Sequence, residues 1–438
     1  MEIYDVVIVG AGLAGLQLSR LLAEQDLRVL LVDRKTDLSR AVHTTGIFVR
    51  RTLEDFPLPD DCLGPVVRDV TLYSPARRKL ELHSSHDEFR VGRMGLLYER
   101  FLNEAISAGV DWMPRTQFVD CSRWHDRSRV EMKTQKTSIQ LESRYVVGAD
   151  GARSPVARAL GLEQNREWIV GLEEVLEGVP AEGPPRFHCF LDPMLAPGYL
   201  AWAIQDGEQV HIGVGGYAAR FDPAGALKHF RASLHGILDL SAATVIERRG
   251  GSIPVGGVLR NIVNSQGPLL GDAAGAVSPL TAGGLDPCMR QSTYAAAVIA
   301  NYLRGGDPRV LAAYSGELFR ARFVSRLWMR RLLAGIRSRA VLEVGCALMR
   351  LPLMSSFAEH VFFGRGSFPE VEFDFAQSAN AKAPTRKILK TESREQRESP
   401  AASRAKYCYC RRHSGNTSDS RDSQRSLAAS TFQKTGCT

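Results

Sequence analysis

Apolar runs and helical spacing define the amino-terminal part of the chain. Residues 6–9 and 29–32 are short uninterrupted apolar runs, which are typical of parallel strands buried on both faces. Between them, Leu18, Leu21 and Leu22 recur at the spacing of one helix face. The pattern predicts a strand, a turn, a helix and a second strand, as at the start of a parallel sheet covered by helices.

A two-residue alternation replaces this pattern in the middle of the chain. Apolar residues alternate over residues 70–83 and on both sides of Asp206–Gly207, a pair that favours a tight turn. Residues 186–193 add a further strand-like segment. These segments predict an antiparallel sheet that contains hairpins.

Residues 306–370 return to helical spacing and predict two or three helices in which arginines alternate with large apolar residues. Two interpretations of these helices stay open. In the favoured one they pack on the rest of the protein with solvated arginines, and in the other they make a peripheral contact with a membrane. No apolar run has the length needed to span a bilayer.

The net charge of +8 comes entirely from the carboxyl-terminal tail. Residues 376–438 hold 13 Lys and Arg against five Asp and Glu, so residues 1–375 are neutral overall. The tail is rich in Ser, Arg, Lys and Gln, which is typical of disorder. A folded basic surface is not indicated, and we expect no nucleic-acid partner.

Eight cysteines are spread along the chain without a disulfide framework, and its first residues do not resemble a signal peptide. Both features favour a reducing, cytoplasmic location. Cys408, Cys410 and His413 lie close together without the spacing of a zinc site, so no metal is expected.

The turn after the first strand carries Gly10, Gly12 and Gly15 in G-x-G-x-x-G spacing. Glycines at these places allow a tight turn, the approach of a pyrophosphate to the backbone, and close helix–strand packing. Asp33 ends the second strand 23 residues after Gly10, near the spacing at which a carboxylate binds a ribose hydroxyl. These features predict a dinucleotide site and leave FAD and NAD open.

Three later segments extend this picture. Arg93 precedes an amphipathic helix, and Asp150–Gly151 follows a strand-like run. In the third, residues 269–287, Asp272 stands among small residues that bury little apolar surface but let a ligand reach the backbone. Asp286, near the end of that segment, is expected to favour the amino end of the next helix.

The four segments together resemble the flavoprotein superfamily of aromatic hydroxylases, halogenases, lycopene cyclases and geranylgeranyl reductases. The resemblance covers about residues 1–310 and implies an α/β fold, in which a Rossmann-like FAD-binding domain is interleaved with an antiparallel-sheet substrate domain. It implies that Asp272 accepts hydrogen bonds from ribityl or ribose hydroxyls of FAD. The implied cofactor-binding residues are Gly10, Gly12, Leu13, Ala14, Gly15, Asp33, Arg34, Arg93, Asp150, Gly151, Gly271, Asp272, Pro279, Gly283, Gly284 and Leu285.

Within the superfamily the resemblance is closest to the geranylgeranyl reductase group. Gly275 follows the GDAA residues where hydroxylases usually have His, and residues 197–205 resemble an aromatic motif of the reductases in a shifted register. A His at position 275 is expected to crowd the flavin or alter its oxygen reactivity while the fold survives. Many of these reductases have a Cys-Gly-rich segment beside the flavin, whereas this chain has Thr44, Thr45 and Gly46 there.

The resemblance implies an FAD-dependent oxidoreductase that takes electrons from NAD(P)H and reduces carbon–carbon double bonds of a small apolar, isoprenoid-like substrate. An FAD-dependent monooxygenase and a redox-neutral flavoprotein of the lycopene cyclase type stay open as alternatives, and the W-x-W-x-I-P signature of halogenases is absent. His43, Tyr199 and Trp202 are weak catalytic candidates, because residues of these types more often serve packing. The oligomeric state is left open.

The expected domain boundaries follow from the order of these patterns. The FAD-binding domain is expected to be discontinuous, over residues 1–60, 90–165 and 255–305. The substrate domain takes residues 61–89 and 166–254, the carboxyl-terminal helices take 306–370, and the disordered basic tail takes 376–438.

Overall fold

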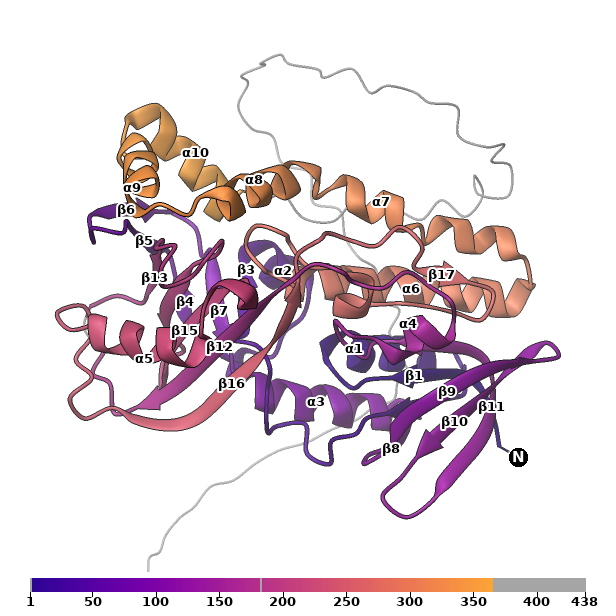
Figure 1. Ribbon diagram of the computed structural model, residues 1–438. Helices are drawn as coiled ribbons and strands as arrows, with labels where there is room; N and C mark the ends of the chain where they lie inside the picture. The colour runs from indigo at the N-terminus through magenta and orange to yellow at the C-terminus, as the bar shows by residue number, and fades with distance from the viewer. Residues whose placement is uncertain (1, 182, 365–438) are drawn as a thin grey trace, which may run out of the picture. The chain divides into compact units, whose positions relative to one another are not determined.

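The sheet that the first strand builds is parallel at its centre, as the apolar runs predict (Figure 1). The computed structural model describes residues 2–181 and 183–364, and the tail expected over residues 376–438 lies outside them. The six-stranded sheet has the order β8-β2-β1-β11-β10-β9, in which β8, β2, β1 and β11 run parallel. Its strands are β1 (Ile3–Val9), β2 (Val29–Val32), β8 (Asp111–Met113), β9 (Gln117–Trp124), β10 (Arg127–Lys133) and β11 (Ser138–Gly148).

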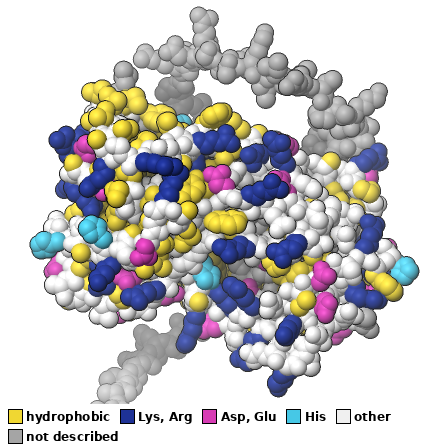
Figure 2. All heavy atoms as spheres, in the orientation of Figure 1, with side chains coloured by type: hydrophobic (Ala, Val, Ile, Leu, Met, Phe, Trp, Pro, Cys, Tyr) yellow, Lys and Arg dark blue, Asp and Glu magenta, His cyan; other side chains and the backbone are white. Residues whose placement is uncertain are grey.

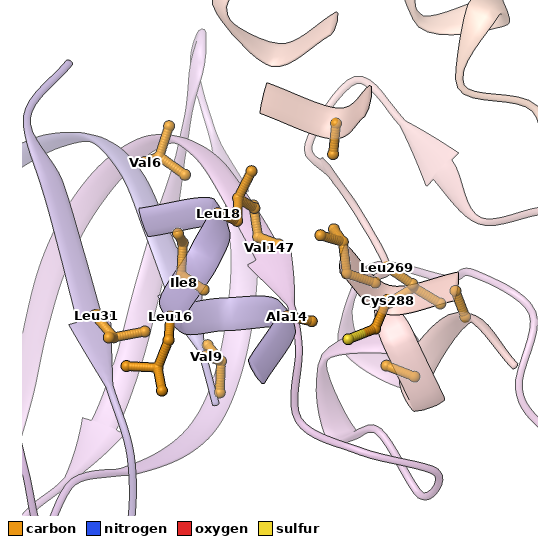
Figure 3. Packing of buried hydrophobic residues seen from close by; sticks show 14 of the residues in the cluster. Val6, Ile8, Val9, Ala14, Leu16, Leu18, Leu31, Val147, Leu269 and Cys288 are labelled. Carbon is orange, nitrogen blue, oxygen red and sulfur yellow. The ribbon is translucent and has the colours of Figure 1, made fainter. Parts of the chain in front are cut away.

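Helices pack on this sheet through apolar faces. The helix α1 (Leu13–Ala23) contacts both α3 (Met94–Ser107) and α6 (Leu285–Gly305). Ala14 points from α1 toward the segment that carries Leu269 and Cys288, so small residues let the two parts of the chain come close (Figure 3). The short helices nearby are α2 (Arg50–Asp55) and α4 (Pro155–Ala159).

A seven-stranded, mostly antiparallel sheet forms the second layer, with the order β16-β12-β15-β14-β13-β5-β6. Both predicted hairpins are present in it, as β5–β6 and β14–β15. Its strands are β5 (Asp69–Tyr73), β6 (Lys79–His83), β12 (Trp168–Glu177), β13 (Arg186–Phe190), β14 (Ala201–Gln205), β15 (Val210–Gly216) and β16 (Thr244–Pro254). The predicted fold class, a Rossmann-like domain interleaved with an antiparallel sheet, is therefore confirmed.

Both faces of the seven-stranded sheet are covered. On one face Ile212 and Val214 pack against Leu227 and Phe230 of α5 (Pro223–Ser233). The other face packs against a three-stranded sheet of β3 (Ile47–Val49), β7 (Phe89–Gly92) and β4 (Leu63–Val67). A small ribbon of β17 (Val263–Asn264) and β18 (Gly267–Pro268) leads into the Asp272 segment. We call the face that carries Trp202 the inner face.

The carboxyl-terminal helices number four among the described residues, so the expected two or three is corrected. They are α7 (Gly316–Ala321), α8 (Val324–Gly335), α9 (Arg339–Leu348) and α10 (Pro352–Phe363), and Gly335 and Pro352 stand where the helical run is broken. The favoured interpretation of solvated arginines is wrong for Arg326 and Arg330, which turn inward. Across the part of the chain that the structure describes, no helix combines the length and hydropathy needed to cross a membrane.

Candidate cofactor and substrate site

Three of the four motif segments meet at one edge of the parallel sheet: the glycine turn, Asp150–Gly151 and the Asp272 segment. Val9 of β1 is in register with Val32 of β2 and with Gly148 of β11, so the turns after these strands lie side by side. The N–H of Leu270 donates to the carbonyl of Gly148 at 2.8 Å, which brings the Asp272 segment to the same edge. The carboxyl ends of parallel strands are where ligands bind in open α/β sheets.

The three glycines of the first turn have different surroundings. A Cβ atom at Gly10 would lie 2.3 Å from the carbonyl oxygen of Ala149, and one at Gly15 would lie 1.9 Å from the carbonyl oxygen of Gly10. Around Gly12 the described atoms leave open space, with nothing within 4 Å of such a Cβ. Gly10 and Gly15 therefore serve close packing, whereas Gly12 leaves the backbone accessible to a ligand.

Asp33 is held beside this turn. One carboxylate oxygen accepts the N–H of Ala11 and the other accepts the N–H of Lys35, each at 2.8 Å. A carboxylate has more acceptor capacity than these two bonds use. Asp33 can therefore also accept a sugar hydroxyl, while the adjacent Arg34 is exposed.

Two helix amino ends face this region without a side-chain cap. The N-cap residue of α1 is Gly12 and that of α6 is Gly284, and neither helix has a side chain that caps its first amides. Uncapped amides and the helix dipole favour an anion. Leu13, Ala14 and Gly15 form the first turn of α1, and Leu285 starts α6.

The loop before α6 contains the remaining small residues of the motif. Pro279 is buried, Gly283 is exposed, and Asp286 is buried in the first turn of the helix. The carboxylate of Asp286 accepts the hydroxyl of Thr52 at 3.0 Å and the guanidinium of Arg290 at 2.9 Å. Asp286 therefore ties α6 to α2 in addition to lying near the helix amino end.

Two carboxyls at the sheet edge are poorly solvated. Burial raises the pKa of Asp150 to about 6 and that of Asp272 to about 6. The Oδ2 atom of Asp150 accepts the N–H of Val156 at 3.0 Å, and its buried Oδ1 atom has no protein partner among the described residues. Gly151 adjoins it at a φ of +85° with open space around it. An unsatisfied buried oxygen is costly, which indicates that a ligand donates to it.

The backbone around Asp272 is fixed by neighbouring side chains. The amide of Asn165 donates to the Asp272 carbonyl at 2.8 Å, and Gly271 donates its N–H to the side chain of Gln291 at 2.8 Å. A Cβ at Gly284 would lie 3.5 Å from the Oδ1 atom of Asp272, so the carboxylate points toward the amino end of α6.

Arg93 is placed at the start of α3 and has an acidic partner. Its guanidinium lies 2.8 Å from the carboxylate of Glu208, in the turn between β14 and β15. Arg93 therefore joins the helix layer to the seven-stranded sheet.

The inner face of the seven-stranded sheet presents aromatic rings laid over glycines. A Cβ at Gly213 would lie 2.2 Å from the indole of Trp202, and one at Gly215 would lie 2.6 Å from the ring of Tyr199. The Tyr199 hydroxyl donates to the carbonyl of Thr281 at 2.7 Å. Tyr199 and Trp202 therefore form an aromatic surface that reaches the loop before α6.

A buried ionic cluster lies on the same face. Glu173 of β12 accepts the indole N–H of Trp202 at 3.1 Å and contacts the Nδ1 atom of His211 at 3.1 Å. The Nε2 atom of His211 lies 3.2 Å from Asp206. Although burial opposes the charge, the hydrogen bonds to Asp206 and Glu173 raise the pKa of His211 to about 9. Likewise, despite its burial, Glu173 has a lowered pKa because of its contacts with His211.

The loop between β2 and β3 is attached to this face through three contacts. Thr45 donates its hydroxyl to Glu173, the Nδ1 atom of His43 lies 3.1 Å from the Gly250 carbonyl, and Arg249 donates to the carbonyl of Thr44 at 3.1 Å. Burial is the main cause of the lowered pKa of His43. The sheet therefore holds the loop after β2 and, through Tyr199, the loop before α6.

Glu173 and His211 were missed by the sequence reasoning. Their signal is weak, because Glu173 is one of three glutamates in its strand, His211 is the one polar residue in its strand, and the two stand 38 positions apart. Only the pairing of β12 with β15, in which Val175 faces His211 and Glu173 faces Gly213, brings the two side chains together.

Comparison with known families and proteins agrees with this geometry. Residues 3–330 match a family model described as an FAD binding domain. A digeranylgeranylglycerophospholipid reductase of Methanothrix thermoacetophila is 27% identical over 325 residues, which cover 71% of this chain and 81% of the relative. Digeranylgeranylglycerophospholipid reductase 1 of Methanopyrus kandleri is 30% identical over 303 residues, covering 65% and 77%.

Solved structures share the fold at low sequence identity. A geranylgeranyl bacteriochlorophyll reductase-like protein from Thermoplasma acidophilum superposes with a TM-score of 0.73 at 20% identity, covering 84% of this chain and 98% of that chain. A p-nitrophenol 4-monooxygenase from Pseudomonas putida gives 0.65 at 16% identity, covering 83% and 99%. The architecture is therefore common to a reductase-like protein and a monooxygenase.

Proposed function

Because the chain belongs to the FAD binding domain family and is an FAD-dependent oxidoreductase, we propose that it reduces carbon–carbon double bonds of an apolar, isoprenoid-like substrate. The names of the curated relatives, reductases of a digeranylgeranyl lipid, support this substrate class. The proposal separates this chain from the monooxygenases that share its fold.

The backbone at Gly275 is the observation that carries the proposal. Gly275 has a φ of +68°, and a Cβ there would lie 2.7 Å from the Gly257 carbonyl and 2.8 Å from the Asn165 side chain. The position at which hydroxylases of the superfamily usually have His therefore has no room for a side chain. This corrects the expectation that a His at position 275 would leave the fold intact, because the substitution strains the backbone itself.

The residues at the sheet edge fit FAD. The open space at Gly12, the uncapped amino ends of α1 and α6 and the unpartnered Oδ1 of Asp150 suit a ligand with a pyrophosphate and sugar hydroxyls. Gly12 and the first turn of α1 would hold the pyrophosphate, and Asp33 and Asp272 would accept hydroxyl groups. When bound and reduced by the electron donor, the flavin would supply the hydride for the reduction and return to its oxidised form.

The inner face of the seven-stranded sheet supports an apolar substrate. Trp202 and Tyr199 lie with ring centroids 6.4 Å apart and form a wall. Tyr199 contacts the loop before α6, and Trp202 contacts Glu173, which also binds Thr45 of the loop after β2. Such a wall excludes water from an alkene chain and orients it, and the single polar atoms of the two rings are already bonded to protein.

NAD(P)H is proposed as the electron donor. A cavity of about 190 Å³ is lined by Arg153, Ser154 and Arg158 of the segment that follows Asp150, and these are groups that bind phosphate. Its wall also includes Ala273 of the Asp272 segment, so it adjoins the cofactor residues.

The proposed reaction is tested with a phospholipid that carries geranylgeranyl chains. We expect NADPH to reduce the protein-bound flavin without oxygen, and the lipid then to gain one H₂ for each double bond reduced, as measured by mass spectrometry. Rapid peroxide formation or a hydroxylated product on adding oxygen would favour the monooxygenase instead. An isomerised product with no net reduction would favour the redox-neutral class.

Asp272→Asn should weaken FAD binding about tenfold. The amide keeps the shape but is a weaker acceptor, since bonds to charged groups contribute about 1.5–3 kcal/mol against about 1 kcal/mol for neutral ones. Because the pKa of Asp272 is raised to about 6, wild-type affinity should also fall as pH drops through 6. Fluorescence titration with FAD at pH 5 and pH 8 measures both effects. Equal affinity of variant and wild type at pH 8 would show that Asp272 is not a hydroxyl acceptor.

A further inference from the structure

The helix α8 exposes a stripe of large apolar residues and turns two arginines inward. Val324, Trp328 and Leu332 follow one another at helical spacing and are exposed, with Trp328 at 65% and Leu332 at 72%. Arg326 and Arg330 occupy the opposite face, where Arg330 is only 1% exposed. An amphipathic helix of a globular protein normally turns its apolar stripe inward.

The two inward arginines have specific contacts. Arg326 donates to the hydroxyl of Ser278 at 2.9 Å, in the segment that leads to α6. The Arg330 guanidinium lies 5.5 Å from the ring centroid of Tyr199 and 5.0 Å from that of Tyr217. These contacts fix the orientation of α8, so its apolar stripe is held outward.

The following helices expose apolar stripes as well. In α9, Leu342 and Cys346 are buried while the other apolar positions point outward. Figure 2 shows apolar side chains gathered at the upper left, over α9 and α10 of Figure 1. The exposed large apolar residues of α8–α10 and of the residue that caps α10 are here called the outer apolar set, and they are Val324, Trp328, Leu332, Val341, Val344, Leu348, Leu351, Met354 and Phe357.

Basic side chains accompany the outer apolar set. Arg331 lies over the Trp328 ring at 5.3 Å, and Arg322 and Arg337 are exposed. Glu343, the acid of α9, uses its carboxylate to bind the Ser74 hydroxyl and the Ala76 N–H, each at 3.0 Å. The exposed charge beside the apolar stripes is therefore mainly positive.

We propose that α8, α9 and α10 dock the protein on the surface of an anionic phospholipid bilayer. Trp, Leu, Val and Phe side chains enter the boundary between headgroups and acyl chains, and arginines bind lipid phosphate. The contact is interfacial, in keeping with the absence of a spanning helix among the described residues. The proposed contact rests on the exposed apolar side chains and arginines of these helices, and it does not depend on which reaction the flavin performs.

Charge complementarity favours an anionic lipid surface over a second copy of the chain or the chain's own tail as the partner of these helices. A symmetric dimer through these helices would bring the arginine margins of two copies together, which like charges oppose. Residues 376–438 carry the net charge of +8 and few apolar residues, so they are poorly matched to this basic, apolar surface. The same charge adds to attraction toward an anionic bilayer.

The test is sedimentation of the full-length protein with vesicles. We expect binding to an equal mixture of phosphatidylcholine and phosphatidylglycerol and much weaker binding to phosphatidylcholine alone. Trp328→Ser/Leu332→Ser should reduce the partition coefficient at least tenfold, and Arg331→Gln/Arg337→Gln should reduce it about tenfold at low salt. Met194→Ser is the matched control, because Met194 is also 72% exposed but lies outside these helices.

A spectroscopic variant locates the contact. Trp328→Phe keeps an apolar ring, so it should still bind vesicles but lose the blue shift of tryptophan emission that wild-type protein shows on binding. Lack of binding by wild type would overturn the proposal. So would equal binding by wild type and Trp328→Ser/Leu332→Ser, which would assign the attraction to basic residues elsewhere. A dimer in light scattering that Leu332→Ser dissociates would make the surface a subunit interface instead.

Discussion

Gly12→Val should yield a folded protein that retains almost no FAD, whereas Gly15→Val should fail to fold. Gly12 has φ −75° and ψ −179°, which a β-branched residue adopts readily, and a new Cβ there meets no described atom within 4 Å. The same atom at Gly15 would lie 1.9 Å from the carbonyl oxygen of Gly10. The two substitutions therefore separate the ligand-binding role of the glycine turn from its packing role.

Gly12→Val should act mainly on FAD affinity, whereas Gly15→Val should act on folding stability. Gly12→Val loses about 1 kcal/mol of stability as a poorer N-cap, and it weakens FAD binding roughly a hundredfold, or about 2.7 kcal/mol, because the isopropyl group occupies the approach to the backbone. Gly15→Val costs about 3 kcal/mol or more through overpacking against a backbone atom that cannot move aside. Flavin released on denaturation measures the first effect, and circular dichroism measures the second.

Gly12→Ala serves as the graded control, since its single methyl group should weaken binding less than the valine does. If Gly12→Val retained FAD at the wild-type stoichiometry, the pyrophosphate would not approach this turn. If Gly15→Val folded with wild-type stability, the close approach of helix and strand would not be the reason for glycine there.

The glycine turn was predictable because its reasons are local. Gly10, Gly12, Gly15 and Asp33 lie within two strands and one helix, where Gly15 packs on Gly10 and Asp33 accepts the N–H of Ala11. The close approach of Gly10 to Ala149 adds a contact with the segment after β11. The strand bounds of 29–32 agree with β2 for the same reason. Hairpins such as β14–β15 were likewise predictable from alternation and a turn pair.

The orientation of α8 could not be predicted in this way. Helical spacing shows that Val324, Trp328 and Leu332 share a face and that Arg326 and Arg330 share the opposite one, but it does not show which face turns inward. That choice depends on Ser278, Tyr199 and Tyr217, which come from distant segments. The usual rule placed the arginines in solvent, and tertiary contacts reversed it.

The steric reason for glycine at position 275 was also not predictable from the sequence. The sequence indicates a small residue after GDAA, yet it does not show that Gly257 and Asn165 close the space for a Cβ. A left-handed φ combined with that closure makes glycine the only residue suited to the position.

Removing one partner of the Glu173–His211 pair should cost about 3–5 kcal/mol of folding stability, the largest effect expected on the seven-stranded sheet. Both side chains are nearly inaccessible, so Glu173→Leu leaves the imidazolium with Asp206 alone. His211→Leu removes the cation that lies between Glu173 and Asp206 and leaves Glu173 with Arg249 at 3.7 Å. Burying an unbalanced charge is expensive because no water replaces the lost partner. Chemical denaturation of the FAD-loaded protein measures each cost.

The double variant Glu173→Leu/His211→Leu tests whether the two side chains act as a pair. Replacing a buried ion pair by apolar residues is often less costly than breaking it, so the double variant should be more stable than the sum of the single effects predicts. A coupling free energy of at least about 1 kcal/mol is expected for side chains in direct contact. Additive effects would mean that Glu173 acts mainly through Trp202 and Thr45.

The pH dependence of the free energy of unfolding tests the same pair independently. With a folded pKa of about 9 against an ordinary value of 6.5, His211 stabilises the fold fully below pH 6.5, and this stabilisation is lost as pH rises through 9. The expected slope between these values is about 1.4 kcal/mol per pH unit, and His211→Leu should remove it.

His188, whose pKa burial lowers to about 4, is the matched control, because its effect lies below pH 6.5. His188→Leu should therefore leave the slope between pH 6.5 and 9 unchanged, and a wild-type protein with no slope there would show that His211 is neutral in the fold.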